Sequence, residues 1–356
     1  MALKEFYKGK RVFLTYPTSF LGAWTAYSLK YLGAEVFGFA SKAAVSPNLF
    51  DLTNLGNEIS MTYGDFRDLQ SLKQAVEFSQ ADIFIHLGES RSLNDAKAFA
   101  HDCFSESVLS TINIMELLRE TATVRSMVVV SSDKVYKVKN NEPFLESDPV
   151  ASGDILPTAR LCSEMIALSY RHSFFNPEKY NKHKIAIATA RLEAGIGGGE
   201  FGEGSLIADA VKAFSSNAQL ELRNPQSQRP WIHVADQAAG ILLLAAHLYG
   251  RGPKAASTYN LGSNLYKSVG ETMNEFAQVW QAPLSELPLD MSPSLHGRLN
   301  SELAKKDFNW QPQLDLQQTL KDITRWYKAH QAGMPVSAQM NNTLEKIFAF
   351  SDSALY

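Results

Sequence analysis

The segment SSDKVY at 131–136 places side chains that exchange protons next to one another. Ser132, Asp133 and Lys134 offer a hydroxyl, a carboxylate and an ammonium group, a set that can serve as general acid and base. The preceding apolar run SMVVVS, at 126–131, predicts a buried strand that would hold them at its end. A structural interpretation is also open, in which the serine and aspartate side chains only satisfy amides of the following loop.

The stretch VFLTYPTSFLG at 12–22 predicts a strand, a tight turn and a helix, the usual start of a dinucleotide-binding unit. Of the GxxGxxG spacing only Gly22 is present, because Tyr16 and Ser19 stand at the other two positions. Glycine there permits positive φ and close approach of the backbone to a pyrophosphate. We therefore expect Tyr16 to obstruct a dinucleotide, whereas the small Ser19 could donate a hydrogen bond to phosphate.

Short apolar strands alternate with segments of helical length, which predicts an α/β fold: a Rossmann-type doubly wound parallel sheet with a smaller, mostly helical C-terminal region. We expect strands at 11–15, 35–40, 58–63, 82–86, 126–131, 184–190 and 257–261. We expect helices near 20–32, 68–79, 105–121, 158–175 and 236–249, and a flexible loop at 195–204. Residues 1–190 and 232–265 are assigned to the Rossmann-type domain, and 191–231 and 266–356 to a smaller substrate-binding region.

Composition excludes several classes of protein. The net charge is −3 and the charged residues are interspersed, which argues against nucleic acid or an anionic membrane surface as partner. The apolar stretch at 238–246 is too short to span a bilayer and predicts a buried helix. Cys103 and Cys162 are too few for a disulfide framework, and the eight histidines lack ligand spacing, so we expect no metal site. These features, with no secretory signal, predict a cytoplasmic protein.

Several motifs are similar, in order, to those of one known family. They are GKRVFLT at 9–15, GDFRD at 64–68, SSDKVY at 131–136, SYRHSFFNP at 169–177, GGG at 197–199 and RNPQSQRPWIHV at 223–234. Over nearly the whole chain the sequence resembles the CDP-glucose 4,6-dehydratases of the extended short-chain dehydrogenase/reductase family. The resemblance implies tightly bound NAD as a temporary hydride store. It also implies a YxxxK pair that deprotonates the hydroxyl at sugar carbon 4, and an Asp that acts as acid in the elimination of water.

The resemblance also implies residue roles. It gives Ser132, Asp133 and Lys134 the positions of the elimination chemistry. It implies that the cofactor-binding positions are Thr15, Tyr16, Ser19, Gly22 and Asp65, of which Asp65 would contact the adenine. For the diphosphate of a nucleotide sugar it implies Arg223 and Arg229, which suit phosphate geometry, with His233 nearby. An alternative is that the two arginines pair on the surface with Asp236 or Glu200.

The chain departs from the family pattern at the catalytic helix. Leu156 and Arg160 occupy the YxxxK positions, and neither can act as a general base: leucine has no ionisable hydroxyl and arginine stays charged. Pro157 is expected to push Leu156 towards an extended backbone. Glu89 adds a negative charge beside the expected cofactor. Further departures are Ser107, Ala194, Ser205 and Pro293, which replace polar or charged family residues.

These observations leave three hypotheses. The first is a degenerate dehydratase-like protein that binds a nucleotide sugar, or that serves as partner subunit in a homodimer or in a heteromer with an active relative. The apolar faces of 105–121 and 158–175 would form that interface. The second is a non-redox enzyme on a sugar nucleotide that already carries a 4-keto group. The third is an active CDP-glucose 4,6-dehydratase-type lyase with a rebuilt NAD site.

Overall fold

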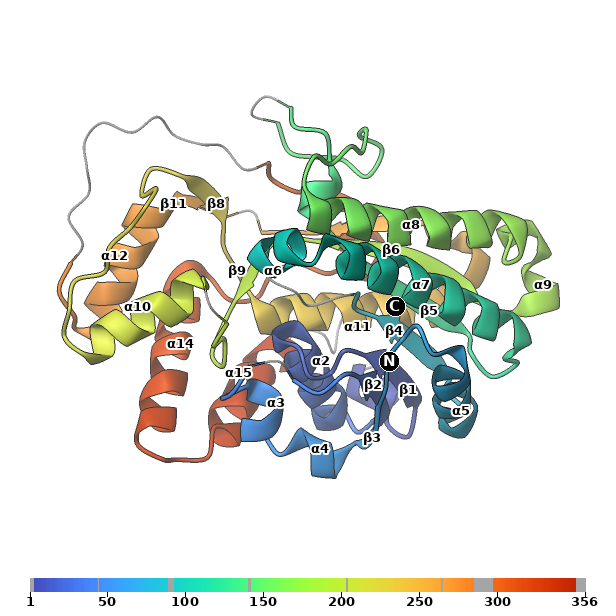
Figure 1. Ribbon diagram of the computed structural model, residues 1–356, viewed down its shortest axis with the longest axis horizontal. Coiled ribbons are helices and arrows are strands. Elements are labelled where there is room, and N and C mark those ends of the chain that lie inside the picture. Colours follow the sequence, from blue (N-terminus) through green and yellow to red (C-terminus); the bar gives the residue numbers. More distant parts are fainter. Residues whose placement is uncertain are drawn as a thin grey trace.

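Seven parallel strands form one sheet in the computed structural model, which describes residues 3–43, 45–88, 93–139, 142–202, 204–263, 265–284 and 297–349 (Figure 1). The strand order is β10-β6-β5-β4-β1-β2-β3. The strands are β1 (Arg11–Thr15), β2 (Glu35–Ala40), β3 (Ser60–Tyr63), β4 (Ile83–His86), β5 (Ser126–Ser132), β6 (Ala186–Leu192) and β10 (Thr258–Leu261). The order reverses between β1 and β4, where ligands of doubly wound sheets bind at the carboxyl ends of the strands.

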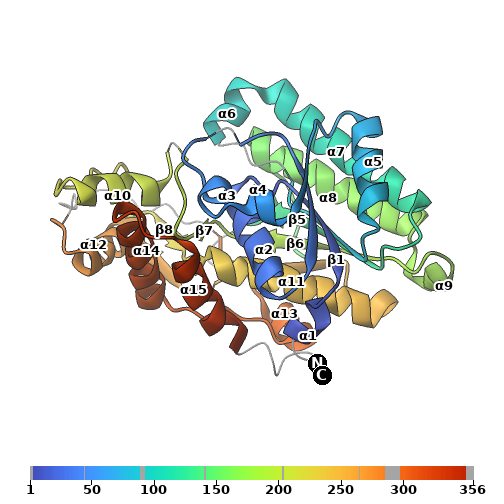
Figure 2. The same ribbon diagram turned by 90° about the horizontal axis from the view of Figure 1, so that it is seen from below.

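Helices cover both faces of this sheet (Figure 2). One face carries α5 (Leu69–Ser79), α7 (Ala100–Glu120) and α8 (Ile155–Ser173), and the other carries α2 (Phe20–Tyr31) and α11 (Val234–Arg251). The central strands β4, β5 and β6 are buried along their whole length because helices cover both of their faces. Helix α11 is buried from Val234 to Leu248, which confirms the buried helix expected around 238–246.

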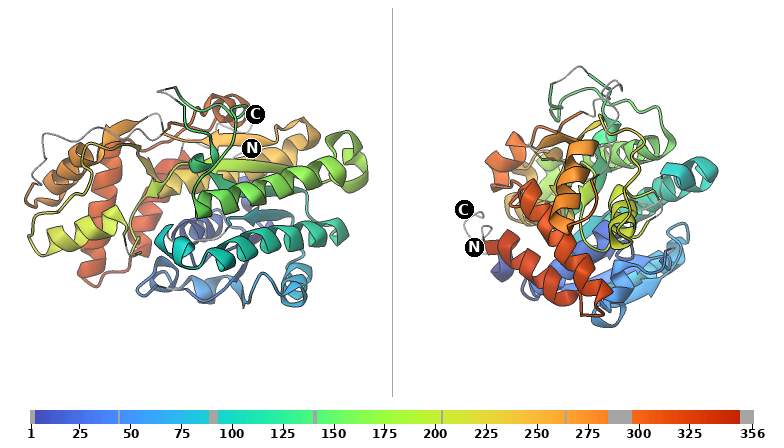
Figure 3. Two further views of the ribbon diagram at one scale, coloured as in Figure 1. Left: turned by 45° about the horizontal axis from the view of Figure 1, so that its top comes forward. Right: turned by 90° about the vertical axis from the view of Figure 1, so that its left-hand side faces the viewer.

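The C-terminal region lies at one end of the sheet (Figure 3). It contains α10 (Leu206–Ser215), α12 (Val269–Trp280), α14 (Leu316–Gln331), and a two-stranded pair of β8 (Gln228–Pro230) and β11 (Tyr266–Ser268). A second short pair joins β7 (Gly195–Ile196) to β9 (Ile232–His233). Helix α15 (Ser337–Ala349) returns to the main domain and packs on α2 and α11.

The remaining elements are short connections. They are α1 (Leu3–Tyr7), α3 (Leu49–Leu52), α4 (Leu55–Glu58), α6 (Leu93–Ala98), α9 (Tyr180–His183), α13 (Glu302–Phe308), η1 (Asp133–Val135), η2 (Pro177–Lys179) and η3 (Gly252–Lys254). Within the described ranges, no helix combines the length and apolar character needed to cross a membrane.

The predicted fold class is confirmed, and the expected strands and main helices are present with shifted ends. One local prediction was wrong: Leu156 is helical, because α8 begins at Ile155 and not at residue 158. Pro157 therefore lies in the first turn of α8, where its missing N–H would have had no intrahelical partner. Helix α7 also begins earlier than expected, at Ala100, since Cys103 is buried against the start of α8.

Candidate functional site

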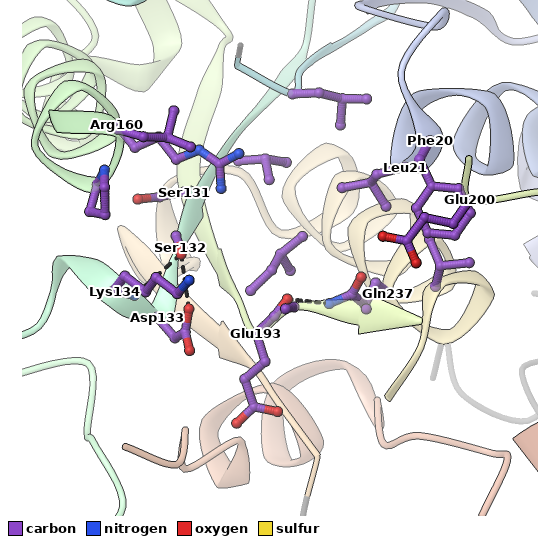
Figure 4. Close-up of a pocket in the computed structure, with 18 residues that line it drawn as sticks. Phe20, Leu21, Ser131, Ser132, Asp133, Lys134, Arg160, Glu193, Glu200 and Gln237 are labelled. Carbon is purple, nitrogen blue, oxygen red and sulfur yellow. Dashed lines mark hydrogen bonds between the residues drawn. The ribbon is translucent and has the colours of Figure 1, made fainter. Parts of the chain in front are cut away.

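A cavity of about 400 Å³ opens at the carboxyl ends of β5 and β6. Its walls come from η1, from the first turn and a half of α8, and from the start of α2 (Figure 4). The cavity also reaches Phe20 and Leu21, which follow β1, and Leu87, which follows β4. It therefore extends to the switch point of the sheet, the expected ligand site of such a fold. The structure brings Asp133, Lys134, Leu156 and Arg160 together in its lining.

Ser132 links two of the predicted catalytic residues. Its hydroxyl donates to Asp133 Oδ1 at 2.9 Å and accepts from the Lys134 backbone N–H at 3.2 Å, so it also caps η1. Burial raises the pKa of the Asp133 carboxyl, while the charges of Lys134 and Arg160 act in the opposite direction. Ser132 thus has the structural role considered from sequence, and Asp133 lies in the lining of the cavity.

Leu156 and Arg160 lie one turn apart on α8 and both line the cavity. Burial lowers the pKa of the Arg160 guanidinium, opposed by the nearby Asp133 and Cys103. A guanidinium begins from a pKa far above neutrality, so Arg160 keeps its charge in the cavity. At the two positions of the YxxxK pair, the cavity is therefore lined by the apolar side chain of Leu156 and by the permanent positive charge of Arg160.

The turn after β1 keeps the backbone shape of a glycine turn although it carries a tyrosine. Tyr16 has φ +53°, a left-handed conformation that is unfavourable for a side chain, and is only 3 % exposed. Its ring stacks on Phe66 with centroids 4.4 Å apart, and its hydroxyl donates to Glu106 Oε1 at 3.1 Å. The ring therefore fills space directly beside Asp65, where the family resemblance implies the adenine contact.

Ser19 acts within the turn itself. Its hydroxyl donates to the Tyr16 carbonyl at 2.9 Å and accepts from the Gly22 N–H at 3.0 Å, which caps α2. The Ser19 hydroxyl, which could have donated to a phosphate, thus makes its hydrogen bonds inside the turn. A Cβ on Gly22 would lie 1.9 Å from the Tyr16 carbonyl oxygen, so the glycine at this one position is required for close packing.

The other predicted cofactor residues are also engaged by the protein. Thr15 Oγ1 lies 3.0 Å from His86 Nδ1 and accepts from the Leu87 N–H at 3.0 Å. Burial lowers the pKa of His86 to about 4, so this histidine is neutral. Asp65 binds Arg67 at 2.6 Å, and the hydrogen bond lowers the Asp65 pKa. The side chains of Thr15, Tyr16 and Asp65 therefore all contact other groups of the protein.

The glycine run at 197–199 is tightly packed, so the expected flexible loop was wrong for this part of the segment. The Gly198 carbonyl accepts from Trp24 Nε1 at 3.1 Å, and a Cβ on Gly198 would lie 2.2 Å from Trp326 Cγ. The Tyr327 hydroxyl then donates to the Glu200 carbonyl at 2.6 Å. The loop holds Glu200 in the cavity wall on the α2 side, and burial raises its pKa to about 7 (Figure 4).

Glu193 also borders the cavity, but its carboxyl points away from it (Figure 4). It accepts from the Ser263 and Leu299 backbone N–H groups at 2.6 and 3.0 Å, and burial raises its pKa to about 8. Sequence reasoning missed Glu193. The available signal was a charged residue placed directly after the buried strand β6, at the sheet edge where ligands bind.

The predicted substrate residues do not meet at the cavity. Arg223 and Arg229 are exposed and do not line it, and His233 is fully buried. His233 Nδ1 accepts from the Ala235 N–H at 3.0 Å as the cap of α11, and burial lowers its pKa to about 4. The prediction that His233 lies beside the substrate was therefore wrong: this histidine is buried and caps α11.

The surface pairing proposed for the arginines is also wrong for Asp236. This buried carboxyl accepts from the Gln313 and Leu314 N–H groups at 2.8 and 3.2 Å.

Among the other departures from the family pattern, Ser205 caps α10 by accepting from the Ala208 N–H. The expectations for Glu89 and Pro293 lie outside the described residues. In the part of the chain that the structure describes, no cluster of His, Cys, Asp and Glu could hold a metal ion.

Comparison with known proteins relates nearly the whole chain to one family. The NAD dependent epimerase/dehydratase family matches residues 15–262. The chain is 31% identical to CDP-glucose 4,6-dehydratase of Salmonella typhimurium over 335 residues, covering 92% of each sequence. It is 25% identical to UDP-glucose 4-epimerase of Neisseria gonorrhoeae, covering 88% of this chain and 96% of that protein.

Solved structures show the same fold. A dTDP-glucose 4,6-dehydratase double mutant of Streptomyces venezuelae, with NAD bound, superposes with a TM-score of 0.76 at 19% identity. That match covers 92% of this chain and 99% of the other. The dTDP-glucose 4,6-dehydratase of Bacillus anthracis in complex with NAD gives 0.72 at 20% identity, covering 92% and 100%. From the sheet order, the cavity at its switch point and these matches together, the chain belongs to the NAD dependent epimerase/dehydratase family.

Proposed function

We propose that this chain is a degenerate nucleotide-sugar 4,6-dehydratase-like protein that binds a nucleotide sugar without carrying out NAD-dependent dehydration. The observation that carries the proposal is the Tyr16 ring, which is buried against Phe66 and bonded to Glu106. Leu156 and Arg160 support it, since they cannot deprotonate a sugar hydroxyl. The nucleotide sugar is inferred from the 31% identical relative, a CDP-glucose 4,6-dehydratase.

Isothermal titration with NAD, CDP and CDP-glucose tests this proposal. We expect saturable binding of CDP-glucose with no NAD present and no measurable heat from NAD. Mass spectrometry of the denatured protein provides the control for cofactor carried through purification. Co-purified NAD together with dehydration of CDP-glucose would contradict the proposal and favour an active lyase with a rebuilt cofactor site.

The partner role concerns the outer faces of α7 and α8, which pack against each other and leave apolar side chains exposed. Leu109 on α7 is 40% exposed and Met165 on α8 is 53% exposed. We propose that these faces pair two copies of the chain, or this chain with an active relative. Light scattering after size exclusion tests it: a dimer that Met165→Glu dissociates supports the interface, and a strict monomer that captures no active relative contradicts it.

A second candidate function is non-redox proton transfer on a nucleotide sugar that already carries a 4-keto group. The cavity favours it because Asp133, Lys134 and Arg160 share one wall, and the ketone makes the neighbouring C–H acidic without any hydride transfer. Deuterium uptake from heavy water into such a sugar is the direct test. Exchange no faster than with the Lys134→Ala variant would count against this candidate.

A further inference from the structure

Two groups of opposite charge face the cavity from different elements. Arg160 reaches it from α8, and Asp133 reaches it from η1 at the end of β5 (Figure 4). Each charge acts on the other, since Arg160 lowers the pKa of Asp133 and Asp133 raises that of Arg160. A donor and an acceptor thus border the same space, where a small polar ligand can contact both.

Ser131 adds a second donor on the same side. Its side chain lines the cavity, is only 1% exposed, and its Oγ has no hydrogen-bond partner among the described residues. Figure 4 shows the guanidinium end of Arg160 directed towards the cavity beside Ser131. A buried hydroxyl without a partner costs free energy, which a ligand oxygen accepting its proton would recover.

We propose that Arg160 and Ser131 bind the carbonyl oxygen of a keto sugar and stabilise the enolate that forms when Asp133 removes the neighbouring proton. The inference rests on the second candidate function above. It gives the residue at the YxxxK lysine position a different role, since Arg160 stabilises charge and transfers no proton. Arginine suits this role because it stays protonated and offers several N–H groups in one plane.

The chemistry balances without an oxidant or reductant. The C–H bond beside the ketone breaks and its proton forms an O–H bond on Asp133. The electron pair becomes the carbon–carbon double bond, and the carbonyl π pair moves to the oxygen beside Arg160. A proton then returns to the same face of that carbon from Asp133, after the carboxyl has exchanged its proton with solvent. Leu156 keeps water from this wall of the cavity, which strengthens the interaction between the guanidinium and the enolate oxygen.

The test uses the full chain in heavy water with two nucleotide sugars, one with a ketone and one with a hydroxyl at carbon 4. NMR follows deuterium uptake beside the ketone, and titration calorimetry follows binding of both compounds. We expect Arg160→Gln to slow exchange about 10²-fold and to remove the preference for the ketone. Arg160→Lys should restore part of the rate. The matched control Arg119→Gln, an exposed residue of α7 paired with Glu116, should exchange at the wild-type rate.

A second variant, Ser131→Ala, tests the inference without the risk of unfolding that a change at a charged residue carries. The hydroxyl of wild-type Ser131 has no partner among the described residues, so the variant should unfold at the wild-type urea concentration while exchange slows several-fold. If wild type exchanges and folded Arg160→Gln and Ser131→Ala do so equally fast, the inference is overturned and the second candidate function remains. If wild type binds neither sugar and catalyses no exchange, the candidate function fails and the inference fails with it.

Discussion

The Tyr16 hydroxyl donates a 3.1 Å hydrogen bond to the Glu106 carboxylate, which ties the turn after β1 to α7. The same tyrosine holds a positive φ in a turn whose usual residue is glycine. Stacking on Phe66 and the bond to Glu106 offset the strain of that backbone conformation. The turn is therefore stabilised by protein groups at the place where a dinucleotide-binding unit contacts its ligand.

Tyr16→Gly should destabilise the fold, because loss of the buried ring costs about 3 kcal/mol and relief of the positive φ returns only about 1 kcal/mol. Urea denaturation measures the difference. Tyr16→Phe is the matched control, since it keeps the stack and removes only the bond to Glu106, at a cost of about 1.5 kcal/mol. Equal stability of Tyr16→Gly and wild type would show that the ring packing is unimportant.

Restoring four family residues together should create NAD binding. The variant combines Tyr16→Gly, Ser19→Gly, Leu156→Tyr and Arg160→Lys, which returns the open turn and the YxxxK pair. Calorimetry with NAD should then give a saturable signal that wild type lacks. The Leu156→Tyr/Arg160→Lys double variant, in which the turn is still filled, serves as control. No binding by the quadruple variant would mean that other residues also block the site.

Gly198→Ala should destabilise the protein by about 2–4 kcal/mol. The added Cβ would lie 2.2 Å from Trp326 Cγ, so α14 or the glycine run must move to accept it. Gly202→Ala is the matched control, because nothing lies within 4 Å of a Cβ at that position. Thermal unfolding followed by circular dichroism compares the two variants. Similar melting temperatures for both would contradict the tight packing described for residues 197–199.

Glu164→Gln should cost about 3–5 kcal/mol, because it leaves the buried Arg191 guanidinium without its counter-charge. Glu164 is 0% exposed, and Arg191 Nε lies 3.1 and 3.2 Å from its two carboxyl oxygens. The exposed pair of Glu35 and Arg11 gives the control, with about 0–1 kcal/mol expected for Glu35→Gln. Urea denaturation should therefore separate the two variants clearly, and comparable losses would refute the buried pair's importance.

Glu193 should make the fold less stable as the pH rises. Its folded pKa of about 8 lies above the ordinary glutamate value of 4.5, so the native state holds a proton that the unfolded chain releases. The stabilisation is complete below about pH 4.5, declines above it and is lost as the pH passes about 8. Glu193→Gln cannot ionise and should flatten this part of the stability profile. Urea midpoints from pH 5 to 9 provide the measurement, and an unchanged slope would exclude Glu193 as its source.

The fold and part of the site followed from sequence. Alternation of short apolar strands with helical segments predicted the doubly wound sheet, because each pattern is local and repeats along the chain. The position of Asp133 and Lys134 after β5 placed them at the carboxyl edge, where the cavity lies. Leu156 and Arg160 were found by their spacing from a recognisable segment, and residues four apart along a helix share one face.

Tertiary structure decided how these side chains are used. No local pattern shows that Tyr16 meets Glu106, 90 residues away, or that His233 caps α11 inside the core. The tight packing of Gly198 depends on Trp326 from α14, which the sequence places 128 residues later. Sequence by itself determined the elements and their order, since these depend on neighbouring residues. Only the folded chain determined burial, charge pairing and the shape of the cavity, because these depend on segments distant in sequence.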